Sequence, residues 1–146
     1  MRVLVQRSKE ASCTVNGNVT GKIASGLVLF VGFTSGDTIE KIQYLVHKIV
    51  NLRIFDDENN IMNKSILETD NKEVLSISQF TLYADTKKGN RPSYINALNG
   101  EEAIKLYDLF NEELSKYVRV QTGVFGADMK INLINDGPIT IWLERE

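Results

Sequence analysis

The sequence has few of the residues on which many enzymes and metalloproteins depend. It contains one cysteine, Cys13, and one histidine, His47. A single cysteine cannot form an internal disulfide, and the two residues together cannot supply a cysteine- or histidine-based metal site. Helical periodicity places His47 away from the apolar stripe of a predicted helix, so a Ser-His-Asp triad is not expected. Catalysis would therefore depend on hydroxyl groups, backbone amides or the substrate itself.

Long apolar runs and an export signal are also missing. The opening segment Met1–Arg7 is too short and becomes charged too soon to be a signal peptide, and no run approaches the length of a bilayer span. We therefore expect no membrane association and a reducing, cytoplasmic location. The 146 residues, with 42% hydrophobic and 25% charged side chains, fit one soluble domain, residues 1–146.

Excess charge of one sign is absent as well. The net charge is −2, so nucleic-acid binding would need a local patch rather than a globally basic surface. The one candidate patch contains Lys87, Lys88 and Arg91, and charge alone favours a solvated turn over a binding patch. The acidic run 56–60 lacks the glycine and the terminal glutamate of a calcium loop, so we expect no metal site there.

Hydrophobic patterning predicts many strands and two amphipathic helices. One helix begins near Asp37 and Glu40, which have capping-box spacing, and ends near Leu52. The other opens at Asn99 and carries an apolar stripe that reaches Tyr117. The elements do not alternate as βαβ units, so we expect an α+β fold with an antiparallel or mixed sheet curled toward a barrel. The predicted strands cover residues 2–7, 12–16, 19–24, 27–33, 73–80, 118–122, 129–134 and 139–144.

A glycine-proline pair, Gly137-Pro138, interrupts the last apolar run, in a chain with only two prolines. Proline removes a ladder donor from a strand, and glycine weakens strand packing. One interpretation is a tight turn between two hairpin strands. The other is a backbone device, such as a cis peptide, that presents main-chain carbonyls where a side chain would be unsuitable.

Two further segments place polar or flexible residues beside apolar strands. Residues 78–81 end a strand, and period-2 geometry puts Gln79 and Thr81 on one face and Ser78 and Phe80 on the other unless the strand bends. In residues 122–129, two glycines allow close backbone approach around Phe125. Taken singly, both segments fit ordinary structural roles.

Four segments together resemble the D-aminoacyl-tRNA deacylases, in order and in spacing. They are residues 78–82, 88–93, 122–129 and 135–140, and the opening Met1–Arg7 fits as well. The departures are mild: Ile139 stands where valine is common, Tyr94 where phenylalanine is common, and Cys13 lies in the early hairpin.

The resemblance implies a homodimeric hydrolase, without cofactor or metal, whose active sites lie at the subunit interface. Its substrate is tRNA whose 3′-terminal adenosine carries a D-amino acid or a mischarged glycine. In this family the peptide matching Gly137-Pro138 is cis and enters the partner's site. Rigid carbonyls there would crowd the position of an L side chain, while a D side chain points outward and glycine escapes rejection.

The resemblance also assigns roles within the pocket. Ser78, Gln79, Phe80 and Thr81 would line the site that holds the aminoacyl ester. Thr81 is the natural candidate nucleophile, but the matched motifs contain no histidine or lysine to activate it. We favour attack by water assisted by the adenosine 2′-hydroxyl, with backbone amides near Phe80 and Thr81 stabilising the oxyanion. Thr81 would then position the substrate.

The remaining assignments concern support and binding. Phe125 and Met129 would pack around the adenosine or the opposing loop, and Arg7 would hold that loop by hydrogen bonds. The basic residues listed above become candidate phosphate contacts for the tRNA end. Two other functions stay open from the residues: a threonine-dependent hydrolase of another small ester or amide, and a noncatalytic dimeric RNA-binding module.

Overall fold

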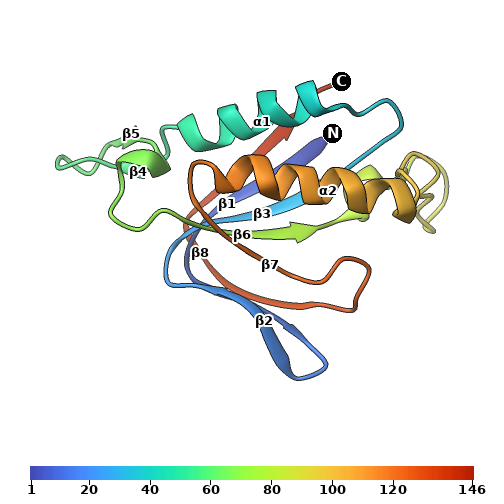
Figure 1. Ribbon diagram of the computed structural model, residues 1–146, viewed down its shortest axis with the longest axis horizontal. Helices are drawn as coiled ribbons and strands as arrows, with labels where there is room; N and C mark the ends of the chain where they lie inside the picture. Colours follow the sequence, from blue (N-terminus) through green and yellow to red (C-terminus); the bar gives the residue numbers. More distant parts are fainter.

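A long first strand organises the sheet in the computed structural model, which describes residues 1–146 (Figure 1). Strand β1 (Arg2–Val15) pairs antiparallel with β3 (Gly26–Gly32) along its first half and with β2 (Asn18–Ile23) along its second half. Its other edge pairs antiparallel with β8 (Lys130–Glu144). The first strand is therefore one unbroken element, where the sequence predicted two.

The rest of the sheet is parallel. Strand β6 (Glu73–Ser78) lies parallel to β3, and β7 (Arg119–Thr122) lies parallel to β6. The β1–β2 hairpin curls around until the Thr20 hydroxyl donates to the Thr122 carbonyl at 3.3 Å. This contact brings β2 beside β7, so the mixed sheet is nearly closed into a barrel. The predicted α+β class with a curled mixed sheet is confirmed.

Helices α1 (Ile39–Asn51) and α2 (Gly100–Ser115) lie side by side on one face of the sheet (Figure 1). Asn99 caps α2 as expected, since its side chain accepts the Glu102 N–H at 3.1 Å. Thr38, not Asp37, caps α1, because the Asp37 carboxylate instead accepts the Thr34 N–H at 2.8 Å in the preceding turn.

Two helix predictions can be compared with the exposure of single side chains. His47 is exposed on α1, as the apolar periodicity indicated. Tyr117 lies beyond the end of α2 and is 45% exposed, so its expected place in the core stripe was wrong. The helix had already ended at Ser115, and the 3.6-residue period no longer applied.

Two apolar clusters hold these layers together. The larger fills the space between the helices and the sheet, and the smaller lies on the opposite face, inside the curl of the β1–β2 hairpin. Each fully buried aliphatic or aromatic side chain contributes about 1.5–3 kcal/mol to folding. The largest members of the first cluster include Phe110, Ile42, Leu45, Ile49 and Leu114, and the second contains Ala11, Cys13, Ile23, Val28, Leu75 and Ile77.

Four short elements were not predicted: the hairpin of β4 (Phe55–Asp56) and β5 (Met62–Lys64), and the 3₁₀ turns η1 (Ile66–Glu68) and η2 (Phe80–Tyr83). They span only two to four residues each, which is too short for a periodic signal. None of the helices is long and apolar enough to cross a membrane.

Replacing Gly26 with alanine tests how closely β3 and β6 must approach. Gly26 has φ +142°, and an added Cβ would collide with the main-chain carbonyl of Glu73. We expect Gly26→Ala to lower the free energy of unfolding by about 2–4 kcal/mol, measured by urea denaturation. Gly36 has φ +86° with no atom near a Cβ, so Gly36→Ala should cost only about 1 kcal/mol. Equal losses in the two variants would contradict the steric explanation.

Candidate active site

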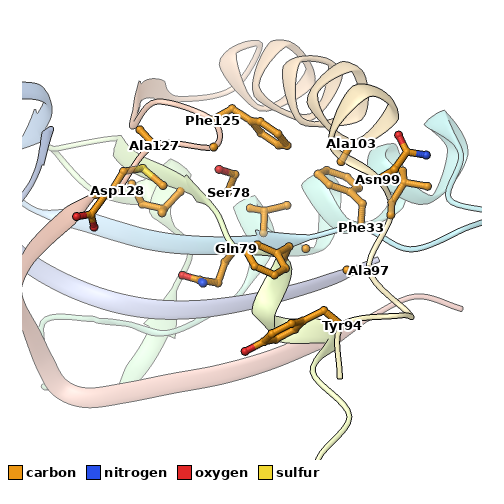
Figure 2. A pocket seen from close by; sticks show the side chains of 18 of the residues that line it. Phe33, Ser78, Gln79, Tyr94, Ala97, Asn99, Ala103, Phe125, Ala127 and Asp128 are labelled. Carbon is orange, nitrogen blue, oxygen red and sulfur yellow. The ribbon is translucent and has the colours of Figure 1, made fainter. Parts of the chain in front are cut away.

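A cavity of about 610 Å³ opens beside the carboxyl end of β6 and the first turn of α2. Twelve of its 19 lining residues are hydrophobic, which suits an aromatic or apolar ligand more than a small ion. Figure 2 shows Phe125 and Ala103 on one side of the cavity, with Ser78 and Gln79 on the other. The walls therefore come from segments far apart in the sequence: β3, β6, the loop before α2, and the loop before β8.

The chain changes direction where the polar side chains of the cavity begin. Strand β6 ends at Ser78, and η2 starts at Phe80, so strand alternation does not extend past Ser78. As a result Ser78, Gln79 and Phe80 all line the cavity, although the period-2 pattern separated them. Phe80 is 57% exposed and meets Tyr94 edge-on, with ring centroids 5.0 Å apart.

Thr81 lies just outside the cavity and is already hydrogen-bonded. The side-chain amide of Gln79 donates to the Thr81 Oγ1 at 2.6 Å. The Gln79 amide is a donor in this bond, so it cannot take a proton from the Thr81 hydroxyl. The single histidine, His47, is exposed on α1 and does not line the cavity. The geometry thus provides a support for the Gln79 side chain but no base for a threonine nucleophile.

The loop before β8 supplies the apolar wall. Phe125 and Met129 both line the cavity, and the Phe125 ring lies 5.9 Å from that of Tyr107. The Tyr107 hydroxyl donates to the Ser76 carbonyl at 2.7 Å, and burial raises the pKa of this phenol, which keeps it a neutral donor. At Gly123 a Cβ would collide with the sulfur of Met129, so the close backbone approach expected for this loop occurs at that glycine.

Gly137-Pro138 forms a bulge within a continuous strand. Asn135 pairs with Ser8 and Thr140 pairs with Gln6, so residues 136–139 all lie opposite the single residue 7. The Gly137-Pro138 peptide is cis. Because β8 does not reverse direction, the hairpin-turn interpretation was wrong, and the predicted strands 129–134 and 139–144 form one element.

The Asn135 side chain closes this bulge from both ends. Its amide donates to the Arg7 carbonyl at 3.1 Å and to the Ile139 carbonyl at 2.9 Å. Its oxygen accepts from the side-chain amide of Gln6 at 3.1 Å and from the Thr140 hydroxyl at 3.0 Å. With every hydrogen-bonding site occupied, the side chain fixes both ends of the bulge.

The Arg7 side chain also contacts the bulge, through Asp136. Its guanidinium is buried, and Nε lies 3.3 Å from the Asp136 carbonyl and 3.2 Å from the Asp136 carboxylate. On its other side Nη1 donates to the Ile54 carbonyl at 2.8 Å and lies 3.4 Å from Asp56. Arg7 therefore connects the bulge to the β4–β5 hairpin, which no local sequence pattern indicated.

The structure brings some of the expected site residues together and leaves others apart. Ser78, Gln79, Phe80, Phe125 and Met129 share the cavity, but the bulge of the same chain does not line it. The basic residues Lys87, Lys88 and Arg91 are exposed on the loop after η2, where Asp85 and Ser93 form an antiparallel bridge.

Sequence reasoning missed several lining residues because it assigned them only structural roles. Asn99, Gly100 and Ala103 were taken as the start of a helix, yet the first turn of α2 borders the cavity. Leu98 is held there because its N–H donates to the Phe33 carbonyl at 3.0 Å. No local signal in the sequence placed the first turn of α2 beside the end of β6.

Comparison with known proteins identifies the family of the chain. The family profile of D-Tyr-tRNA(Tyr) deacylase matches residues 4–144. A D-aminoacyl-tRNA deacylase of Bacillus cytotoxicus is 54% identical over 145 residues, which covers 99% of both chains.

Two solved structures share the fold. The structure of a c-Myc DNA unwinding element binding protein superposes with a TM-score of 0.93 at 39% identity, covering 100% of this chain and 99% of the other. A probable eukaryotic D-amino acid tRNA deacylase gives a TM-score of 0.84 at 18% identity, covering 97% of both chains, and shows the fold alone. The profile match along nearly the whole chain, and the 54% identity to the bacterial relative, show that this chain belongs to the D-aminoacyl-tRNA deacylase family.

Proposed function

We propose that this enzyme acts in the cytoplasm on tRNA charged with a D-amino acid or mischarged with glycine, and hydrolyses the ester to free tRNA and amino acid. The observation that carries the proposal is the cavity itself. Its apolar walls suit a flat nucleoside, while Ser78, Gln79 and the start of η2 form a polar end where an ester can lie.

The reaction needs no reactive side chain. Water attacks the ester carbonyl carbon, the bond to the adenosine 3′-oxygen breaks, and that oxygen takes up a proton, with the 2′-hydroxyl relaying protons. Phe80 and Thr81 begin η2, where main-chain N–H groups have no acceptor within the helix. We assign these N–H groups to the developing oxyanion, and the Thr81 hydroxyl to fixing the Gln79 side chain that borders the ester.

Rejection of L-amino acids requires a second copy of the chain. The Gly137-Pro138 bulge lies outside its own cavity, so we propose that it enters the cavity of a partner. An apolar row crosses the sheet face away from the helices, where Leu4 pairs with Phe30 on one side and Trp142 on the other. Trp142 is 46% exposed, so this face offers apolar surface for a homodimer.

The exposed loop after η2 would contact the rest of the tRNA. Lys87, Lys88 and Arg91 lie on this loop, which follows directly from the polar end of the cavity. We propose that they contact backbone phosphates, because clustered cations on a chain of net charge −2 provide a local patch rather than a general attraction.

Incubation with D-Tyr-tRNA and L-Tyr-tRNA tests the function directly. We expect release of D-tyrosine and not of L-tyrosine. Release of both would contradict the stereochemical filter, and binding of tRNA without release of either would indicate a noncatalytic RNA-binding module.

Substituting Thr81 separates the two roles considered for its hydroxyl. Loss of a true nucleophile costs on the order of 10⁴-fold or more in turnover. We expect Thr81→Val, which keeps the shape, to lower turnover of D-Tyr-tRNA by less than about tenfold, since the side chain only orients Gln79. A tRNA ending in 2′-deoxyadenosine should instead react about 10²–10³-fold more slowly with the wild-type enzyme. A larger loss of turnover in Thr81→Val than with the 2′-deoxyadenosine tRNA would support the nucleophile mechanism instead.

Mixed dimers test whether the bulge acts across subunits. Asn135→Ala removes the side chain that closes the bulge, so we expect its homodimer to hydrolyse L-Tyr-tRNA. Ala97→Trp blocks the cavity, in which Ala97 is a lining residue. In a dimer of one Ala97→Trp and one Asn135→Ala chain, the open cavity receives an intact bulge from the blocked chain.

The purified mixed dimer should therefore regain rejection of L-Tyr-tRNA, measured as the ratio of D to L hydrolysis. If each chain used its own bulge, the mixed dimer would hydrolyse L-Tyr-tRNA as the Asn135→Ala homodimer does. Asn132→Ala, at an exposed asparagine on the same strand, is the matched control and should leave the ratio unchanged.

A further inference from the structure

A second, polar hollow of about 330 Å³ lies across a thin wall from the cavity. The wall is made of η2 and residues 94–97. Neighbouring residues in the chain face the two spaces: Phe33 and Ala97 line the cavity, whereas Thr34 and Asn96 line the hollow. The Thr34 hydroxyl donates to the Asn96 carbonyl at 2.6 Å, which ties the two sides of the wall together.

The floor of the hollow carries a cation, Arg2, that two hydrogen bonds hold in place. The Arg2 guanidinium donates to the Leu82 carbonyl at 2.8 Å and to Glu144 at 2.9 Å, and it lies 4.3 Å from the centre of the Tyr83 ring. Burial raises the pKa of the Tyr83 phenol, which leaves a neutral hydroxyl able to donate or accept.

The rim of the hollow is set by the start of the basic loop. Asp85 and Ser93 exchange main-chain hydrogen bonds of 2.7 and 2.9 Å, and the Asp85 carboxylate accepts the Lys87 N–H at 2.9 Å. This turn places Lys87 at the rim together with Thr86 and Asn96. Asp85 is the one carboxylate in the lining, and the main-chain bond to Lys87 already occupies one of its oxygens.

We propose that the hollow binds the nucleotide that precedes the terminal adenosine of tRNA. Lys87 takes the phosphate that joins the two nucleosides, and Asn96 and Thr86 hydrogen-bond the base. The inference rests on the proposed function and deepens it. When the terminal adenosine occupies the cavity, the rest of the tRNA chain continues from its 5′ side, and the hollow lies directly across the wall. Few of the hollow's lining residues are hydrophobic, which suits a base edge and a phosphate better than an amino-acid side chain.

Two non-hydrolysable probes distinguish this subsite from the cavity. The first is 3′-amino-3′-deoxyadenosine carrying D-tyrosine as an amide, and the second is the same compound extended at its 5′ side by cytidylate. We expect the wild-type enzyme to bind the extended probe at least about tenfold more tightly, an advantage that the charge-assisted contact between Lys87 and the phosphate is enough to provide. Calorimetry gives both dissociation constants.

The double variant Lys87→Met, Asn96→Ala should abolish this tenfold advantage and leave the affinity for the shorter probe unchanged. The slope of log affinity against log salt for the extended probe should also fall by about 0.7, as for one lost phosphate contact. Lys72→Met removes an equally exposed lysine at the opposite end of β6 and should change neither constant.

Three results would overturn the subsite: equal wild-type affinity for the two probes, equal loss of both in the double variant, or a matching loss in Lys72→Met. Failure of the shorter probe to bind the wild-type enzyme would instead overturn the deacylase cavity, and the subsite with it. The two failures are therefore distinguishable.

Discussion

Hydrogen bonding along both edges of β1 is the constraint on which the rest of the structure depends. This strand supports β3 and β2 on one edge and β8 on the other, so it places both the sheet beneath the helices and the closing hairpin. The ladder with β8 is interrupted opposite residue 7. There the buried guanidinium of Arg7 donates to the main-chain carbonyl of Asp136, which has no partner in the ladder.

In the proposed mechanism, main-chain groups and fixed dipoles carry most of the chemistry of the site. The start of η2 offers N–H groups, the bulge offers carbonyls, and the side chains of Gln79 and Asn135 hold these parts in place through short hydrogen bonds. Such an arrangement suits a substrate whose side chain varies, since backbone groups recognise the geometry at the α-carbon rather than one side chain. It also explains how a chain with one exposed histidine and one buried cysteine can serve a hydrolase.

The cavity, the hollow and the bulge are each proposed to contact a different part of the substrate. Under the proposed function, the apolar cavity holds the adenosine, the polar hollow holds the preceding nucleotide, and the bulge of a second chain acts as the filter for the amino acid. The Thr34–Asn96 hydrogen bond ties together the segments that form the wall between the first two. We propose that the second chain packs on the apolar row through Leu4, Phe30 and Trp142, of which Trp142 is exposed.

The sequence by itself determined the class of fold, the two helices and the motifs that mark the family, because these depend on local periodicity, capping and residue spacing. Tertiary structure alone decided that residues 129–134 and 139–144 form one strand, since a bulge is defined by the partner strand and not by the bulged segment. It likewise brought Ser78, Gln79 and Phe80 to one cavity by ending β6 and starting η2, and it joined Arg7 to Ile54 across the fold. These contacts link residues distant in sequence, and no local pattern records which surfaces will meet.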